Sequence, residues 1–133
     1  MSVQKPQPSR RILVADDDPA ILRLVAAIVE KEGYTVVPAR DGQEAYTILK
    51  SDSDFVAGIF DVVMPHIQGT ELVRYMKTEK RLMRIPVMMM IAEQNPRLSS
   101  DSFSGQAVVF LLKPFTTAQL QIMLRMLIAK TGS

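Results

Sequence analysis

The sequence predicts an α/β protein whose parallel five-stranded sheet is covered by helices on both faces. Five short apolar runs are separated by stretches with apolar residues at helical spacing. Because these runs are apolar throughout and do not alternate with polar residues, the strands are expected to be buried on both faces, which is typical of parallel sheets. The runs comprise residues 11–15, 34–39, 55–60, 87–91 and 108–112.

The first helix is expected to begin at Pro19 and to end before Gly33. Asp18 is a suitable N-cap residue, and proline is favoured at the first helical position. Glycine is common just after a helix ends. The predicted buried face consists of apolar residues at helical spacing: Ile21, Leu24, Val25, Ile28 and Val29.

Two further helices follow the second and third strands. Asp41 and Glu44 resemble a capping box that opens a short helix through Lys50. The next helix follows a loop with Pro65 and Gly69, and its predicted buried face carries three apolar residues: Leu72, Val73 and Met76.

The last helix has a clear signature, whereas the one before it does not. Thr116 and Gln119 resemble another capping box. The apolar face that follows comprises Leu120, Met123, Leu124, Leu127 and Ile128. A helix is also expected within residues 97–104, but serine is a poor helix former and Pro96 and Gly105 bracket the segment.

Composition favours one domain, expected over residues 10–130, with a lead-in at 1–9 and a short tail at 131–133. The chain has 133 residues, of which 47% are hydrophobic and 23% charged, as in ordinary globular domains. The absence of cysteine excludes thiolate metal sites. A net charge of +2 does not favour nucleic-acid binding, and no apolar run approaches the roughly 20 residues that span a bilayer. We therefore expect a cytoplasmic protein.

Charged residues follow three of the five strands. Asp16 and Asp17 come after the first, Asp61 after the third and Lys113 after the fifth. Each has an ordinary explanation by itself, because aspartate is common in helix caps and turns. In an open parallel sheet, however, ligands bind at the carboxyl ends of the strands. Their joint occurrence at these ends therefore favours a binding site.

Three neighbouring carboxylates repel one another, and a divalent cation relieves that repulsion. Oxygen ligands alone favour Mg²⁺. Lys113 adds a positive charge suited to a phosphoryl oxygen, and an aspartate carboxylate can attack phosphorus to form an acyl phosphate. Asp61 is the preferred nucleophile because it stands alone at its strand end, whereas Asp16 and Asp17 are expected to hold the metal.

The motifs at these ends resemble those of the response-regulator receiver family of two-component systems over residues 10–130. The matching segments are Ile12–Pro19 (ILVADDDP), Asp61–Pro65 (DVVMP) with Gly69, and Lys113–Phe115 (KPF). The resemblance implies a flavodoxin-like (βα)5 three-layer sandwich with strand order 2-1-3-4-5. It also implies a signalling domain in a phosphorelay that is not itself a conventional enzyme.

The resemblance implies a role for each matching residue. Asp61 would accept the phosphoryl group from the phosphohistidine of a sensor histidine kinase or phosphotransfer protein. Asp17 would bind Mg²⁺ directly, Asp16 would do so through water, and Val63 would offer its backbone carbonyl. Lys113 would contact the phosphoryl group.

The resemblance has further consequences. The Lys113–Pro114 peptide bond is expected to be cis, and Phe110 matches the switch aromatic of the last strand. Phosphorylation by small phosphodonors and slow autodephosphorylation are also implied.

The chain departs from the family at the end of the fourth strand. The family has Thr or Ser where this chain has Ile91, which cannot donate a hydrogen bond to a phosphoryl group. We therefore expect Asp61 to be phosphorylated but the conformational response to be weak or differently coupled. The alternative is a degenerate receiver that binds partners independently of phosphorylation. A phosphatase is disfavoured because Val63 stands where aspartyl phosphatases carry a second aspartate.

Other residues receive simpler interpretations. His66 is expected to be a solvent-facing loop residue, and Met88, Met89 and Met90 are expected to fill the core. Met126 is a candidate for a partner surface, although most apolar residues of the last helix are expected to be buried. The cognate kinase, the output and the oligomeric state carry no signature in the sequence, and it is open whether the domain stands alone or belongs to a longer regulator.

Overall fold

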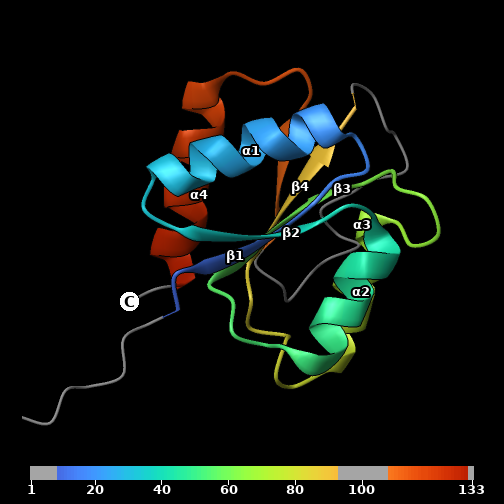
Figure 1. Ribbon diagram of the computed structural model, residues 1–133. Helices are drawn as coiled ribbons and strands as arrows, with labels where there is room; N and C mark the ends of the chain where they lie inside the picture. Colours follow the sequence, from blue (N-terminus) through green and yellow to red (C-terminus); the bar gives the residue numbers. More distant parts are fainter. Residues whose placement is uncertain (1–8, 93–107, 132–133) are drawn as a thin grey trace, which may run out of the picture.

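A computed structural model describes residues 9–92 and 108–131. Its five parallel strands form one sheet in the order β2-β1-β3-β4-β5, as expected (Figure 1). The strands are β1 (Arg11–Ala15), β2 (Thr35–Ala39), β3 (Ala57–Asp61), β4 (Val87–Ile91) and β5 (Val108–Leu112). The order reverses between β1 and β3, which is where a ligand site is expected in a sheet of this type.

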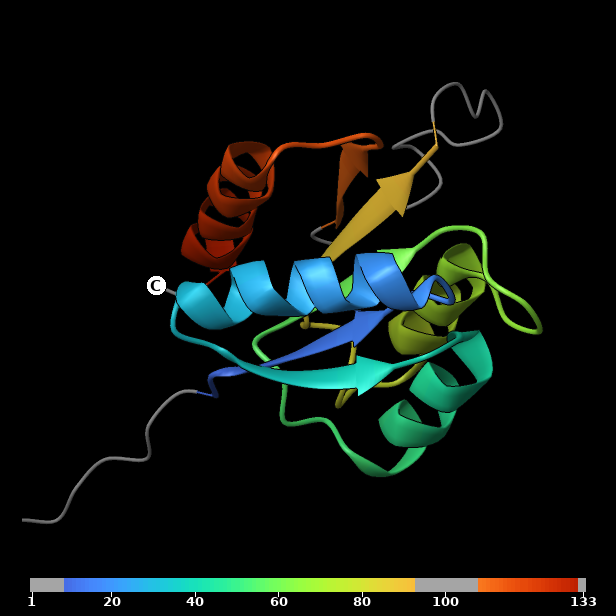
Figure 2. The same ribbon diagram turned by 45° about the horizontal axis from the view of Figure 1, so that its top comes forward.

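The described residues contain helices on both faces of the sheet. The helices are α1 (Pro19–Lys31), α2 (Gly42–Ser51), α3 (Gly69–Thr78) and α4 (Thr117–Thr131). Helices α1 and α4 cover one face, and α2 and α3 cover the other (Figures 1 and 2). The helix expected within residues 97–104 lies outside the described residues. None of the four helices is long and apolar enough to cross a membrane.

Successive residues of a strand pack into two separate hydrophobic cores, one on each face of the sheet. In β1, Leu13 packs beneath α2 and α3, whereas Ile12 and Val14 pack beneath α1 and α4. In β4, Met89 faces the first core while Met88 and Met90 face the second. All three methionines are fully buried, which confirms their role as core residues.

The sequence prediction placed the buried face of α1 partly wrong. Leu22 is buried in the core with Val25, Ile28 and Val29, whereas Leu24 is 46% exposed. Residues two apart in a helix are separated by about 200° around its axis, so Leu22 and Leu24 cannot both face the sheet. Tertiary packing selects Leu22 because it continues the stripe through Val25 and Val29.

Local signals at the helix ends are confirmed. The Asp18 carboxylate accepts from the N–H groups of Ala20 and Ile21, and Gly33 adopts a φ of 94° after α1. Such a φ favours glycine, which explains the helix stop there. The capping-box bonds of Thr116 and Gln119 are reciprocal, at 2.8 and 3.1 Å.

Strand β3 lies further along the chain than the apolar run at 55–60 predicts. It spans Ala57–Asp61, so Asp61 itself belongs to the sheet. The Phe55 side chain is buried, yet its N–H bonds to Ser53 in a turn instead of joining the sheet ladder. The apolar run therefore predicted burial of Phe55 correctly, but it did not predict the residue at which β3 begins to pair with the neighbouring strands.

Candidate phosphoacceptor site

The carboxyl edge of the sheet brings together all four charged residues that the sequence singled out. Asp16 and Asp17 follow β1, Asp61 ends β3, and Lys113 follows β5. Ala15 is paired with Phe60, so the residues after these two emerge side by side at the edge. The prediction that these side chains converge is therefore confirmed as geometry.

The distances within this cluster are short. One carboxylate oxygen from each of Asp16, Asp17 and Asp61 lies within 4.8 Å of the others. The Lys113 Nζ lies 3.1 Å from Asp61 Oδ2 and 3.7 Å from Asp16 Oδ2. Such an arrangement of oxygen atoms is suited to a small divalent cation, with a fixed positive charge beside it.

Asp16 is the most deeply buried acid of the cluster. Its side chain is fully buried, that of Asp61 is nearly so, and Asp17 is exposed. Burial, with a smaller contribution from the neighbouring Asp61 carboxylate, raises the pKa of Asp16 to about 6. The negative charge needed for metal binding is thus held at a cost in free energy.

One of the two carboxylate oxygens of Asp16 accepts no hydrogen bond. Oδ1 accepts from the Asp18 N–H at 2.9 Å, whereas Oδ2 is buried without a hydrogen-bond partner. Lys113 lies at 3.7 Å from Oδ2, which is an ion-pair distance beyond a hydrogen bond. Because buried carboxylate oxygens are normally satisfied, the residues present fit a bound divalent cation.

The loop after Asp61 is held tightly against the end of β3. The Val62 N–H donates to Met90 at 3.0 Å, and the Gly69 N–H donates to the Val62 carbonyl at 2.9 Å. A Cβ at Gly69 would collide with the Asp61 carbonyl oxygen, so glycine is required where α3 begins. These contacts fix the backbone of Asp61.

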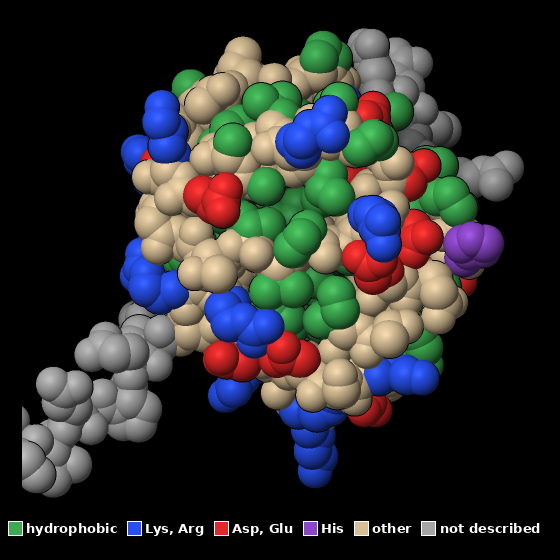
Figure 3. Space-filling model, in the orientation of Figure 1, with side chains coloured by type: hydrophobic (Ala, Val, Ile, Leu, Met, Phe, Trp, Pro, Cys, Tyr) green, Lys and Arg blue, Asp and Glu red, His purple; other side chains and the backbone are tan. Residues whose placement is uncertain are grey.

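Two other loop residues are exposed. Val63 is 61% exposed. His66 is exposed with a φ of 70°, as expected for a solvent-facing loop residue, and the single histidine projects from the surface in Figure 3.

The end of β4 places Ile91 close to the cluster. Its neighbour Met90 pairs with Asp61, and the Ile91 carbonyl accepts from the Lys113 N–H at 2.7 Å. The Ile91 side chain is partly buried against the same core as Phe110. Lys113 and Pro114 are joined by a cis peptide bond, which confirms that expectation.

Two features of this edge were missed by sequence reasoning. One is the Asp18 N–H that orients Asp16, which no side-chain pattern signals. The other is an apolar groove beside Lys113, to which Ile21 and Leu24 contribute. The sequence offered no signal for the groove, because Leu22 and Leu24 are equally apolar and only the structure shows which of them is exposed.

Comparison with known proteins decides the family. The family model of the response regulator receiver domain matches residues 12–125. This chain belongs to that family.

Relatives of the receiver domain are regulators about twice its length. It is 32% identical to the response regulator GtcR of Aneurinibacillus migulanus, with 88% of this chain and 48% of the relative covered. It is 26% identical to the transcriptional regulatory protein SrrA of Staphylococcus aureus, covering 94% of this chain and 50% of that protein. The chain thus spans about half the length of these curated relatives.

Solved structures agree with this assignment. The signal receiver domain of a signal transduction histidine kinase from Syntrophus aciditrophicus is 28% identical, covers 92% of both chains and gives a TM-score of 0.80. The receiver domain of the sensor histidine kinase PA1611 from Pseudomonas aeruginosa is 25% identical, covers 91% of this chain and 98% of its own, and gives a TM-score of 0.78. That structure is described with a magnesium ion coordinated in its active-site cleft.

Proposed function

We propose that this receiver domain accepts a phosphoryl group on Asp61 from the phosphohistidine of a sensor histidine kinase or phosphotransfer protein. The observation that carries the proposal is the convergence of Asp16, Asp17 and Lys113 on Asp61 at one edge of the sheet. The signalling unit would be residues 10–130, acting in the cytoplasm on a protein partner or output domain. Its relatives' names as response and transcriptional regulators support this role.

The three carboxylates would hold the cation in different ways. Asp17 and Asp61 would bind Mg²⁺ directly, Asp16 would bind it through water, and Val63 would supply its backbone carbonyl. The magnesium described in the PA1611 receiver domain supports this choice of metal. Bound Mg²⁺ would supply positive charge to phosphoryl oxygens.

Lys113 and Asp61 would carry the chemistry that the chain itself contributes. The Asp61 carboxylate attacks phosphorus, and the leaving group departs on the opposite side. The Lys113 ammonium, 3.1 Å from Asp61 Oδ2 before transfer, would then pair with an oxygen of the new phosphoryl group. Slow loss of the phosphoryl group to water would reset the domain.

Mass spectrometry tests the phosphoacceptor directly. With acetyl phosphate and Mg²⁺, the wild-type protein should gain the mass of one phosphoryl group, and this gain should disappear in Asp61→Asn or with excess chelator. Asp54→Asn is a matched control because Asp54 is exposed at the opposite end of the sheet. A gain that persists in Asp61→Asn would assign the phosphoryl group elsewhere and defeat the proposal.

We further propose that the conformational response to phosphorylation is weak. Ile91 offers no hydroxyl to follow a phosphoryl oxygen, and its side chain packs in the core shared with Phe110. Amide chemical shifts with beryllofluoride and Mg²⁺ should therefore change around Asp61 but little at Phe110. Ile91→Thr should extend the changes to Phe110. Large changes at Phe110 in the wild-type protein would contradict this proposal.

The second candidate function is a degenerate receiver that binds partners without phosphorylation, and Ile91 is the observation that favours it. The two candidates separate in the same experiments. No mass gain and no Mg²⁺-dependent shift change around Asp61 would support the degenerate receiver.

A further inference from the structure

The short turn between β2 and α2 contacts the two backbone segments that carry the acids of the proposed phosphoacceptor site. Only two residues separate Ala39, the end of β2, from Gly42, the start of α2. On one side, the Ala39 carbonyl accepts from the Asp16 N–H at 3.2 Å. On the other side, Gly42 lies directly against the carbonyl of Ile67, in the loop that joins β3 to α3. The turn therefore supports both the segment after β1 and the segment after β3.

The contact at Gly42 leaves no room for a side chain. A Cβ at this position would overlap the Ile67 carbonyl oxygen and lie 3.0 Å from the Ile67 Cβ. Because these atoms cannot rotate away, either α2 or the loop would have to move. Helix α2 is fixed to the sheet by the buried side chains of Ala45 and Leu49, and close packing resists its displacement. The loop is exposed to solvent at His66, so the loop is the part that would yield.

The two ends of this loop are held in place, which limits where it can yield. The Gly69 N–H donates to the Val62 carbonyl at 2.9 Å, and the Val62 N–H donates to β4. A displacement of Ile67 would therefore be taken up by residues 63–66. These residues include Val63, whose backbone carbonyl is the proposed metal ligand.

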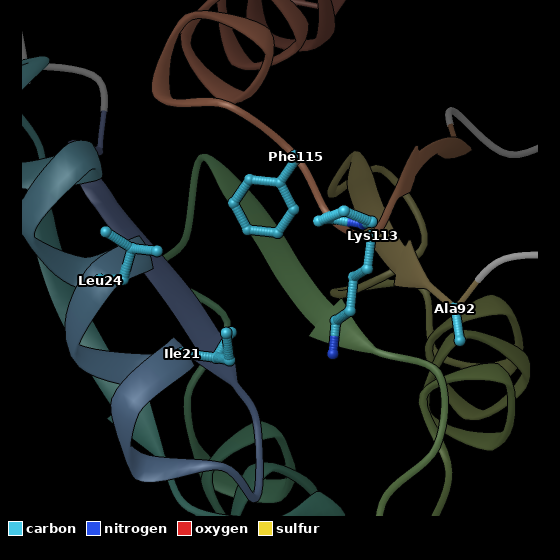
Figure 4. Close-up of a pocket in the computed structure, with 6 residues that line it drawn as sticks. Ile21, Leu24, Ala92, Lys113 and Phe115 are labelled. Atoms are coloured by element: carbon cyan, nitrogen blue, oxygen red, sulfur yellow. The ribbon is translucent and has the colours of Figure 1, made fainter.

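We propose that Gly42 is a positioning residue of the phosphoacceptor site. By allowing α2 to begin against the Ile67 carbonyl, it holds the Val63 carbonyl where Mg²⁺ binds. This inference rests on the proposed function. Lys113 reaches the acids from the β5 side of the sheet, and its side chain points toward the end of β3 in Figure 4. The site is thus supported from two sides, by a charge from the β5 side and by backbone contacts from the β2 side.

The test is the Mg²⁺ dependence of phosphorylation in Gly42→Ala. With acetyl phosphate and intact-mass detection, the Mg²⁺ concentration that gives the half-maximal rate should rise by roughly ten-fold, as for loss of an outer-sphere partner of a metal site. The rate at saturating Mg²⁺ should fall less, because Asp61 and Lys113 keep their positions. Titration with Mg²⁺ alone, followed by amide chemical shifts, should show the same loss of affinity.

Ala45→Gly is the matched control for Gly42→Ala. Ala45 lies on the same helix, and its replacement removes a buried methyl group instead of adding one. Glycine inside a helix is destabilising, but this change places no atom against the Ile67 carbonyl. Urea unfolding should therefore show a loss of stability in Ala45→Gly, whereas its Mg²⁺ midpoint should equal that of the wild type.

A measurement on the wild-type protein tests the inference even if Gly42→Ala does not fold. During the Mg²⁺ titration, the amide signals of Gly42 and Ile67 should shift with the same midpoint as that of Val63, because the three backbone segments are in contact. The amide signal of Leu49, near the far end of α2, should stay unchanged.

Two results would overturn the inference. A Mg²⁺ midpoint in Gly42→Ala equal to that of the wild type, at any loss of stability, would make Gly42 a residue of the fold alone. Amide signals of Gly42 and Ile67 that do not respond to saturating Mg²⁺ would also contradict it. If the wild-type protein binds Mg²⁺ but Asp61 is not phosphorylated, the proposed function fails, and the Mg²⁺ affinities of the variants still decide the role of Gly42.

Discussion

The two ends of β1 carry clusters of acidic and basic side chains that differ in how fully they are satisfied. At the amino end, the Arg11 guanidinium donates to both Asp52 carboxylate oxygens at 3.1 and 2.8 Å and stacks over the Phe55 ring at 4.7 Å. At the carboxyl end, Asp16 Oδ2 is buried and has no hydrogen-bond partner. The first cluster is complete without a ligand, whereas the second is not.

The pKa values follow this difference. Hydrogen bonding to Arg11 lowers the pKa of Asp52, and burial raises the pKa of Asp16. One cluster therefore stabilises its charged form, while the other holds its charged form at a cost. A charged cluster that costs free energy in the absence of a ligand is more informative about function than one that stabilises the fold.

The largest expected effect is on metal binding. Asp16→Asn should lower the affinity for Mg²⁺ by about 10- to 100-fold, as for loss of an outer-sphere metal partner, because a carboxylate is replaced by a neutral amide. Asp52→Asn should leave the affinity unchanged. Titration with Mg²⁺, followed by amide chemical shifts, measures both. Equal losses of Mg²⁺ affinity in the two variants would contradict the difference between the two ends of β1.

The next effect is on the pH dependence of stability. The pKa of Asp16 rises from 3.8 to about 6 on folding, so the folded state binds this proton more tightly than the unfolded state. Without metal, the free energy of unfolding should therefore fall as pH rises from about 4 to 6, by at most about 3 kcal/mol. Denaturant unfolding at several pH values tests this.

The controls for this pH effect are Asp16→Asn and added Mg²⁺. The variant should lack the decline because its side chain does not titrate. Mg²⁺ should offset the decline above pH 6, since it binds the ionised site. A decline of equal size in Asp16→Asn would assign the effect to other groups.

The smallest expected effect is at the amino end. Asp52→Asn should lower the free energy of unfolding at neutral pH by about 1 kcal/mol or less, because the ion pair is partly exposed to solvent. Since the pKa of Asp52 is lowered on folding, its contribution should be present at neutral pH and disappear as pH falls through that pKa.

Asp54→Asn is the matched control for Asp52→Asn and should have a smaller effect. Asp54 lies 3.7 Å from Arg11 and its side chain is 70% exposed. Both variants can be compared by urea unfolding at neutral and acidic pH. A larger loss in Asp54→Asn would show that the bidentate contact of Asp52 is not what stabilises this end.

Sequence patterns predicted most of the fold because their causes are local. Five apolar runs, the caps at Asp18 and Thr116 and the stop at Gly33 all have counterparts in the structure. The rotation of α1 was only partly predicted, because Leu22 and Leu24 are equally apolar and only packing against the sheet distinguishes them. The predicted start of β3 was wrong because apolar character indicates burial and does not show where the strand begins to pair with its neighbours.

The candidate site was predicted through topology and family resemblance combined. The separation of Asp17 from Asp61 along the chain does not show that their carboxylate oxygens lie close together. The strand order does, because it places the ends of β1 and β3 side by side. The replacement at Ile91 was visible in the sequence, whereas its packing in the core of Phe110 was not.

The sequence by itself determined which residues are available for chemistry: three acids and a lysine after apolar strands, with no hydroxyl at Ile91. Only the tertiary structure decided that Asp16 is buried with an oxygen that accepts no hydrogen bond, and that Leu24 opens onto a groove beside Lys113. The physical reason is that desolvation and exposure depend on neighbours from distant segments. A strand's sequence specifies its own side chains but not what covers them.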